Sequence, residues 1–148
     1  MPATLQETLL APETRPHVID DCQALIEQQV SDVSGISGAA VKIAYKTVST
    51  FMPGYVRHMV EVLVPEMVSK LEPFWADFTA SGGSGFGDYL AKRSDEVSEA
   101  LLSITDEHAA GSDKATVVRA YNKVRPSAAK HVTAALPAVG ALVQKYAG

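Results

Sequence analysis

The sequence has one cysteine among its 148 residues, and this scarcity excludes a disulfide framework. Cys22 has no intrachain partner, so the fold must be held by packing. Long apolar runs are also absent, because the longest stretch without a charged side chain is 132–144, thirteen residues, against about 20 for a membrane-spanning helix. The first residues carry neither a basic nor an apolar segment of the kind that starts a secretory signal. We therefore expect a cytoplasmic protein without a membrane span.

Acidic residues are missing after Asp113, although six basic residues lie in 114–148. Residues 1–80, by contrast, carry ten acidic and five basic side chains. A basic segment can attract an anionic partner, so weak nucleic-acid binding through 114–148 is one alternative function. The whole chain has a net charge of −4 and a pI near 5.5, which disfavours a nucleic-acid-binding domain. We interpret the basic segment as a solvated helix face.

Spacings typical of catalytic or metal sites are missing as well. The glycine-rich stretch 81–87 follows a predicted helix rather than a strand and has no Gly-Lys-Ser/Thr, so it is not a phosphate-binding loop. The four histidines form neither the i, i+4 pairs of zinc sites nor the Glu-x-x-His pairs of di-iron bundles. We expect no catalytic residue, no metal and no cofactor. Cys22 lies on an apolar stripe and is interpreted as a small buried hydrophobe.

Apolar residues do recur at helical spacing along almost the whole chain, whereas alternating runs joined by hairpin turns do not. One helix is predicted over about 16–32, and a second with Ser37 as its N-cap, ending at Pro53-Gly54. The next apolar stripe continues from Val56 to Phe78 through two prolines, which predicts kinks there.

The second part of the chain is also predicted to be helical. After the glycine-rich stretch, one helix ends before Ala110-Gly111, and Ser112 or Asp113 is expected to cap the next. Pro126 is expected to open the last helix and Pro137 to kink it. The predicted fold is all-α, a single compact bundle of about seven or eight helices.

One sequence pattern occurs twice in the same order. V-x-x-A-Y-x-x-V followed by P-x-x-x-x-H-x-x-x-x-L is found over 41–63 and again over 117–136. A repeat of this kind predicts an internal duplication. We expect two pseudo-symmetric halves, about 16–80 and 88–148, joined by 81–87 within a single domain 1–148, because neither half alone buries enough surface to be stable.

Aromatic and histidine side chains mark the candidate ligand site. Trp75 lies near the predicted junction, and Tyr45 and Tyr121 lie in the middle of the apolar stripes of the two halves. His131 borders the apolar face of the last helix. Amphipathic aromatic rings often line ligand pockets, so these four residues are our candidate ligand-binding set.

Four segments resemble a small actinobacterial family of uncharacterised, all-helical cytoplasmic proteins. They are 8–12 (TLLAP), 73–78 (PFWADF), 86–90 (FGDYL) and 130–132 (KHV). The resemblance covers nearly the whole chain. It implies one intact bacterial, cytoplasmic domain, and it brings no activity or ligand with it.

These observations favour a non-enzymatic binding or protein-interaction module. Its partner would be another protein, a second copy in a homodimer, or an apolar small molecule held between the two halves. An alternative is a small enzyme with a site across the pseudo-twofold axis, using His131 and Tyr45 or Tyr121 with a carboxylate. A strongly shifted pKa for His131 inside a cleft would support this enzyme alternative.

Overall fold

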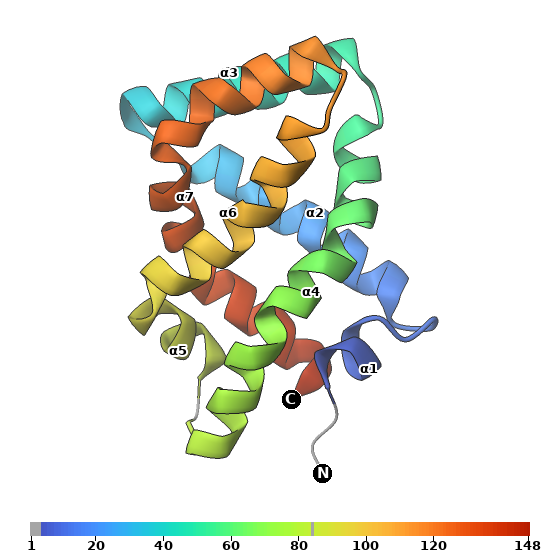
Figure 1. Ribbon diagram of the computed structural model, residues 1–148, viewed down its shortest axis with the longest axis vertical. Coiled ribbons are helices and arrows are strands. Elements are labelled where there is room, and N and C mark those ends of the chain that lie inside the picture. The colour runs from blue at the N-terminus through green and yellow to red at the C-terminus, as the bar shows by residue number, and fades with distance from the viewer. Residues whose placement is uncertain (1–3, 84) are drawn as a thin grey trace.

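The computed structural model describes residues 4–83 and 85–148, which form seven helices and no strand (Figure 1). The all-α prediction is thereby confirmed. The helices are α1 (Leu5–Leu9), α2 (Arg15–Asp32), α3 (Gly35–Phe51), α4 (Tyr55–Ser81), α5 (Phe86–Lys92), α6 (Ser94–Ala110) and α7 (Ala115–Ala147). Thr4 begins the first of them, since its Oγ1 accepts a hydrogen bond from the N–H of Glu7 at 3.1 Å.

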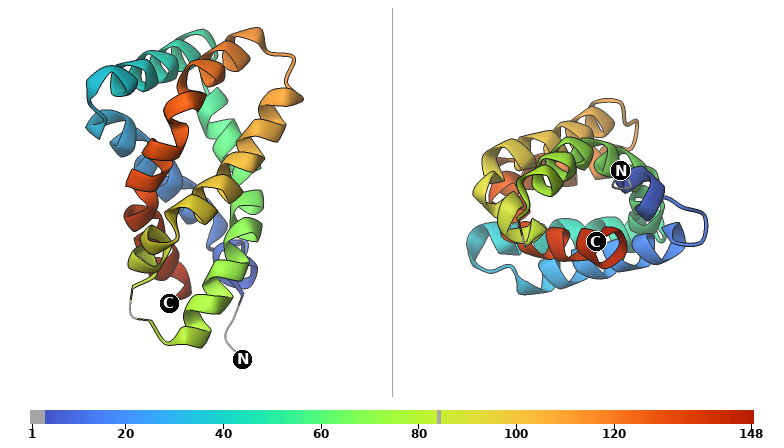
Figure 2. Two further views of the ribbon diagram at one scale, coloured as in Figure 1. Left: turned by 60° about the vertical axis from the view of Figure 1, so that its left-hand side comes forward. Right: turned by 90° about the horizontal axis from the view of Figure 1, so that it is seen from below.

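The long helices surround a common interior. Helices α4 and α6 and the second part of α7 extend along the molecule, while α3 and the first part of α7 lie across one end (Figures 1 and 2). Seen along the long axis, the helices form a ring (Figure 2). One hydrophobic core contains buried residues of six helices, among them Leu9, Val18, Val64, Leu90 and Leu136.

Helix boundaries differ from the prediction around the prolines and caps. The third helix begins at Gly35 after Ser34 rather than at Ser37, and the last begins after Lys114 rather than after Ser112 or Asp113. Pro126 does not open a helix but lies within α7. Figure 1 shows that α7 turns between its first part, beside α3, and the remainder. A proline removes one backbone hydrogen bond, so it bends a helix that tertiary packing otherwise holds together.

Two aromatic-rich helices meet near the glycine-rich stretch. Trp75 and Phe78 of α4 pack against Phe86 of α5, with ring centroids 5.0 and 5.2 Å from that of Phe86. All three rings are buried. This cluster joins the two predicted halves, and the division into duplicated halves itself stays a prediction.

No described helix has the length and apolar character needed to cross a bilayer.

Candidate functional site

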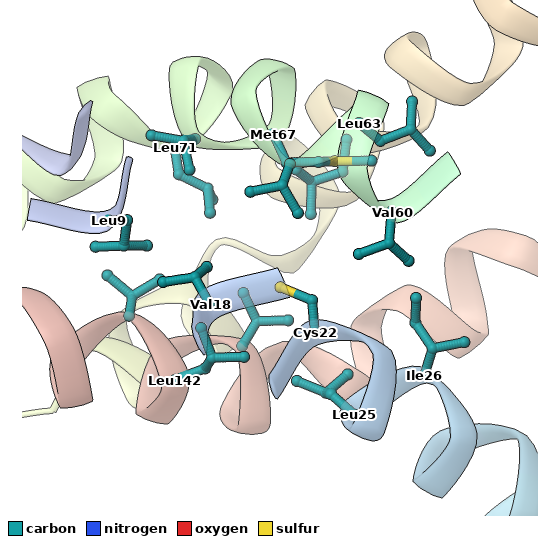
Figure 3. Close-up of a pocket in the computed structure, with 15 residues that line it drawn as sticks. Leu9, Val18, Cys22, Leu25, Ile26, Val60, Leu63, Met67, Leu71 and Leu142 are labelled. Carbon is teal, nitrogen blue, oxygen red and sulfur yellow. The ribbon is translucent and has the colours of Figure 1, made fainter. Parts of the chain in front are cut away.

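An apolar cavity of about 200 Å³ lies among α1, α2, α4, α6 and α7 (Figure 3). All fifteen residues that line it are aliphatic, methionine or cysteine. They are Leu9, Val18, Cys22, Leu25, Ile26, Val60, Leu63, Val64, Met67, Val68, Leu71, Leu101, Val139, Leu142 and Val143. A buried water needs two to four polar partners, and this wall offers none from its side chains. The cavity therefore suits an apolar occupant.

Cys22 places the one thiol of the chain in this wall, between α2 and α4 (Figure 3). Burial raises the pKa of the thiol to about 11, and the negative charge of Asp21 adds to the shift. The group is therefore protonated at neutral pH and acts as a small apolar side chain. Its expected role as a small hydrophobe agrees with this position, although the side chain is only partly buried.

A second cavity of about 310 Å³ adjoins the first and is more open to solvent. Ile26, Val60 and Leu63 line both, so these three side chains lie where the two cavities adjoin. The second cavity lies between α2, α3, α4 and the first part of α7. Together the two spaces reach the size of ordinary small-molecule sites, about 300–1,000 Å³.

The repeated sequence pattern lines this second cavity. Both copies of V-x-x-A-Y-x-x-V contribute all four of their specified residues to its wall. These are Val41, Ala44, Tyr45 and Val48 from α3 and Val117, Ala120, Tyr121 and Val124 from α7. The repeated pattern is visible from spacing alone, and its apolar positions meet in one wall because α3 packs on α7.

Three tyrosines line this wall with their rings, and the surface that faces the cavity is almost entirely apolar. Burial raises the pKa of Tyr45, Tyr55 and Tyr121, so their phenols are neutral at neutral pH. The Tyr121 hydroxyl donates to Asp106, whose carboxylate also accepts from Arg125 at 2.8 Å. These bonds hold the pKa of Asp106 below its ordinary value. Tyr121 is thus fixed in position, with its ring at the cavity.

The four candidate ligand residues do not lie together. Tyr45 and Tyr121 share the second cavity. Trp75 is 6% exposed in the aromatic cluster, where its indole Nε1 is buried without a hydrogen-bond partner. His131 is half-buried with an unpartnered Nε2, and neither Trp75 nor His131 lines either cavity. A ligand role for this set stays a prediction.

The sequence identifies many of the lining residues as members of apolar stripes, but it does not determine whether those stripes close on one another or leave a groove. Val18, Cys22, Leu25 and Ile26 form one predicted apolar stripe, and the long stripe that begins at Val56 supplies others. One sequence signal could have indicated a cavity. The chain has many apolar helical stripes but few large aromatic side chains that could fill the space between them. Among the residues that the structure describes, no group of three or more His, Cys, Asp or Glu side chains is placed to hold a metal ion.

Comparison with known proteins identifies a family. A family model described as "Family of unknown function (DUF6918)" matches residues 5–147. No curated protein and no solved structure matches the chain. The actinobacterial distribution and cytoplasmic location implied by the resemblance stay predictions.

Proposed function

Because the chain belongs to DUF6918, a family of unknown function, we propose its role from the geometry of its cavities: a non-enzymatic module that binds an apolar, chain-like small molecule. The observation that carries the proposal is the pair of adjoining cavities with apolar walls, the first lined by aliphatic side chains, Met67 and Cys22. Cavities of this lining stay dry and accept apolar guests.

The energetic cost of leaving the first cavity empty supports an occupant. Unfilled volume beside aliphatic side chains lowers the stability of the fold because the lining loses packing partners, and this cavity of about 200 Å³ is partly open to solvent. Whole domains are stable by only about 5–15 kcal/mol. A ligand that fills the space restores the lost dispersion contacts and stabilises the folded state.

The lining also restricts the class of ligand. The first cavity has no aromatic ring and no polar side chain, so it recognises no functional group and fits a flexible saturated chain. The second cavity is also almost entirely apolar but opens to solvent, so a polar end of the ligand can reach water at its mouth. An amphipathic molecule with one acyl or alkyl chain meets both requirements, its tail in the first cavity and its polar end at the mouth of the second.

A substitution at the junction of the cavities tests the proposal. Val60→Phe places a ring where the two cavities adjoin, and Val62→Phe makes the same exchange on the outer side of α4, where Val62 is 37% exposed. Titration with a fluorescent polyene fatty acid should give an affinity at least about tenfold weaker for Val60→Phe, a loss of about 1.4 kcal/mol. Val62→Phe should bind as the unaltered protein does.

Circular dichroism confirms that each variant folds, and Ile26→Phe at the same junction replaces Val60→Phe if that variant does not. Equal binding by both α4 variants would place the ligand outside the cavities. Absence of binding by the unaltered chain, with no bound mass in the native mass spectrum, would contradict the proposal.

A further inference from the structure

Helix α3 (35–51) and the first part of α7 with its N-cap Lys114 (114–125) form one end of the molecule, which we call the α3–α7 face (Figures 1 and 2). Its charge differs from that of the rest of the protein. These two segments hold six of the thirteen basic residues and none of the seventeen acidic ones. The remaining chain therefore carries seven basic against seventeen acidic residues. The positive charge of an acidic protein is concentrated here.

Large apolar side chains are exposed on the same face. Ile36, Ile43 and Phe51 of α3 have exposed fractions of 94%, 61% and 74%. The fourth large hydrophobic residue with an exposed side chain among the described residues, Val62, is only 37% exposed. Helix α3 is thus apolar on its inner side, at the second cavity, and apolar again on its outer side. Helices on the surface of soluble proteins normally turn a polar side to water, so this exposed apolar surface indicates a binding site.

The apolar and basic groups meet in one outer groove of about 350 Å³ between the two helices. Ile43 and Phe51 line it from α3, and Arg119 and Lys123 line it from α7. No carboxylate lines the groove, and none of the described salt bridges uses Arg119 or Lys123. The nearby Asp106 is already paired with Arg125. Arg119 donates a hydrogen bond to the carbonyl of Ala115, but within the described residues neither cation is paired with a carboxylate, and both flank exposed apolar side chains.

We propose that the α3–α7 face docks on an anionic lipid surface, with its isoleucines and Phe51 inserted among the acyl chains and its cations at the headgroups. Basic residues interleaved with large apolar ones are the pattern of helices that lie in a bilayer interface. Each Lys or Arg near an anionic surface adds to the attraction, and the long side chains of Arg119 and Lys123 can reach the headgroups.

Other occupants fit the face less well. A nucleic acid matches the cations but leaves two isoleucines and a phenylalanine facing a polyanion or water. In a dimer about a twofold axis, the basic patch of one copy would face the basic patch of the other. Repulsion between these like charges opposes such a dimer. An anionic bilayer satisfies both kinds of side chain at once.

Docking has a geometric link to the cavities, although it does not depend on the proposed function. Ala44 of α3 and Ala120 of α7 line both the outer groove and the second cavity. Only these small side chains contribute to both walls, so a bilayer on the groove lies next to the proposed ligand site. The docking test below uses no cavity ligand, so failure of either proposal leaves the other standing.

Vesicle flotation of the full chain tests docking. The protein should float with vesicles of phosphatidylcholine and phosphatidylglycerol, stay in the dense fraction with phosphatidylcholine alone, and dissociate as salt rises. The Phe51→Trp variant supplies a direct readout at an exposed position, because the one native tryptophan, Trp75, is 6% exposed and its emission should not change. The emission of the introduced indole should shift to the blue on anionic vesicles.

Charge-reversal variants test whether vesicle binding depends on the cations of the α3–α7 face or only on the net charge of the protein. Arg119→Glu/Lys123→Glu should weaken vesicle binding about tenfold or more. The matched control, Lys70→Glu/Lys92→Glu, changes the net charge equally at exposed positions on α4 and α5 and should bind almost as the unaltered protein does. Phe51→Ser should weaken binding without any change of charge.

Three results would overturn the proposal. One is equal loss of vesicle binding in the two charge-reversal variants. Another is binding to duplex or single-stranded nucleic acid that Arg119→Glu/Lys123→Glu weakens, together with no binding to vesicles. That result would assign the face to nucleic acid. The third is a dimer in sedimentation velocity that Phe51→Ser converts to monomer, which would assign the face to a second copy.

Discussion

At the scale of single residues, Cys22 is the most direct probe of the cavity. Burial raises the pKa of its thiol to about 11, two units above the ordinary value of 9.0. Alkylation requires the thiolate, so the folded protein should react about a hundredfold more slowly at neutral pH than an exposed thiol.

The expected pH dependence follows from the direction of this shift. The alkylation rate by iodoacetamide should rise about tenfold per pH unit up to near pH 11, whereas the chain unfolded in guanidinium should reach its plateau near pH 9. Mass spectrometry of peptides from timed samples measures both rates at Cys22, the single thiol of the chain. A plateau near pH 9 in the folded protein would show that the thiol faces water.

At the scale of elements, the contact between α5 and α7 depends on two glycines. A Cβ atom added at Gly140 would lie 2.2 Å from the Cα of Gly87, which is backbone and cannot rotate away. This close approach brings α5 onto α7 and closes the core at Phe86 and Leu136, both completely buried. Glycine is required here by space, since neither residue has a positive φ.

Gly140→Ala should therefore destabilise the protein by about 1–3 kcal/mol or more through overpacking. Gly111→Ala is the matched control, because a Cβ there meets its nearest neighbour at an ordinary 3.6 Å. It should change stability by no more than about 0.5 kcal/mol. Urea unfolding followed by circular dichroism gives both values. Equal midpoints for the two variants would mean that α5 can move away from α7 without cost.

At the scale of the whole molecule, a ligand in the cavities should stabilise the folded protein. A ligand that binds only the folded state stabilises it by mass action, about 2.7 kcal/mol at a hundred times its Kd. For a chain of this length, that corresponds to a change in Tm of about 5–10 °C.

Removing the ligand should therefore lower the melting temperature. Protein purified without denaturant should melt about 5–10 °C above the same protein refolded after solvent extraction, and palmitate should restore the difference. Differential scanning calorimetry measures each Tm. The Val60→Phe variant serves as the control, since its blocked junction should remove the response to palmitate. Identical melting of the two preparations, together with no response to palmitate, would show that the cavities hold nothing.

The helices follow from sequence because their signals are local. Helical apolar spacing predicted the second helix as about 16–32, and the structure has Arg15–Asp32. The Thr4-x-x-Glu7 spacing likewise marks the start of α1. The course of α7 through Pro126 was not predictable in this way, because packing against α3, α5 and α6 outweighs the local preference for a break.

Which side of each helix turns inward was therefore determined by the sequence alone, through the 3.6-residue period of its apolar residues. Whether those sides close on one another was decided only by the tertiary structure. The distance between two helices depends on pairs of side chains far apart in the chain, as where Gly87 and Gly140 allow α5 to approach α7. Around Cys22 and Val60 the apolar stripes do not close on one another but surround a cavity.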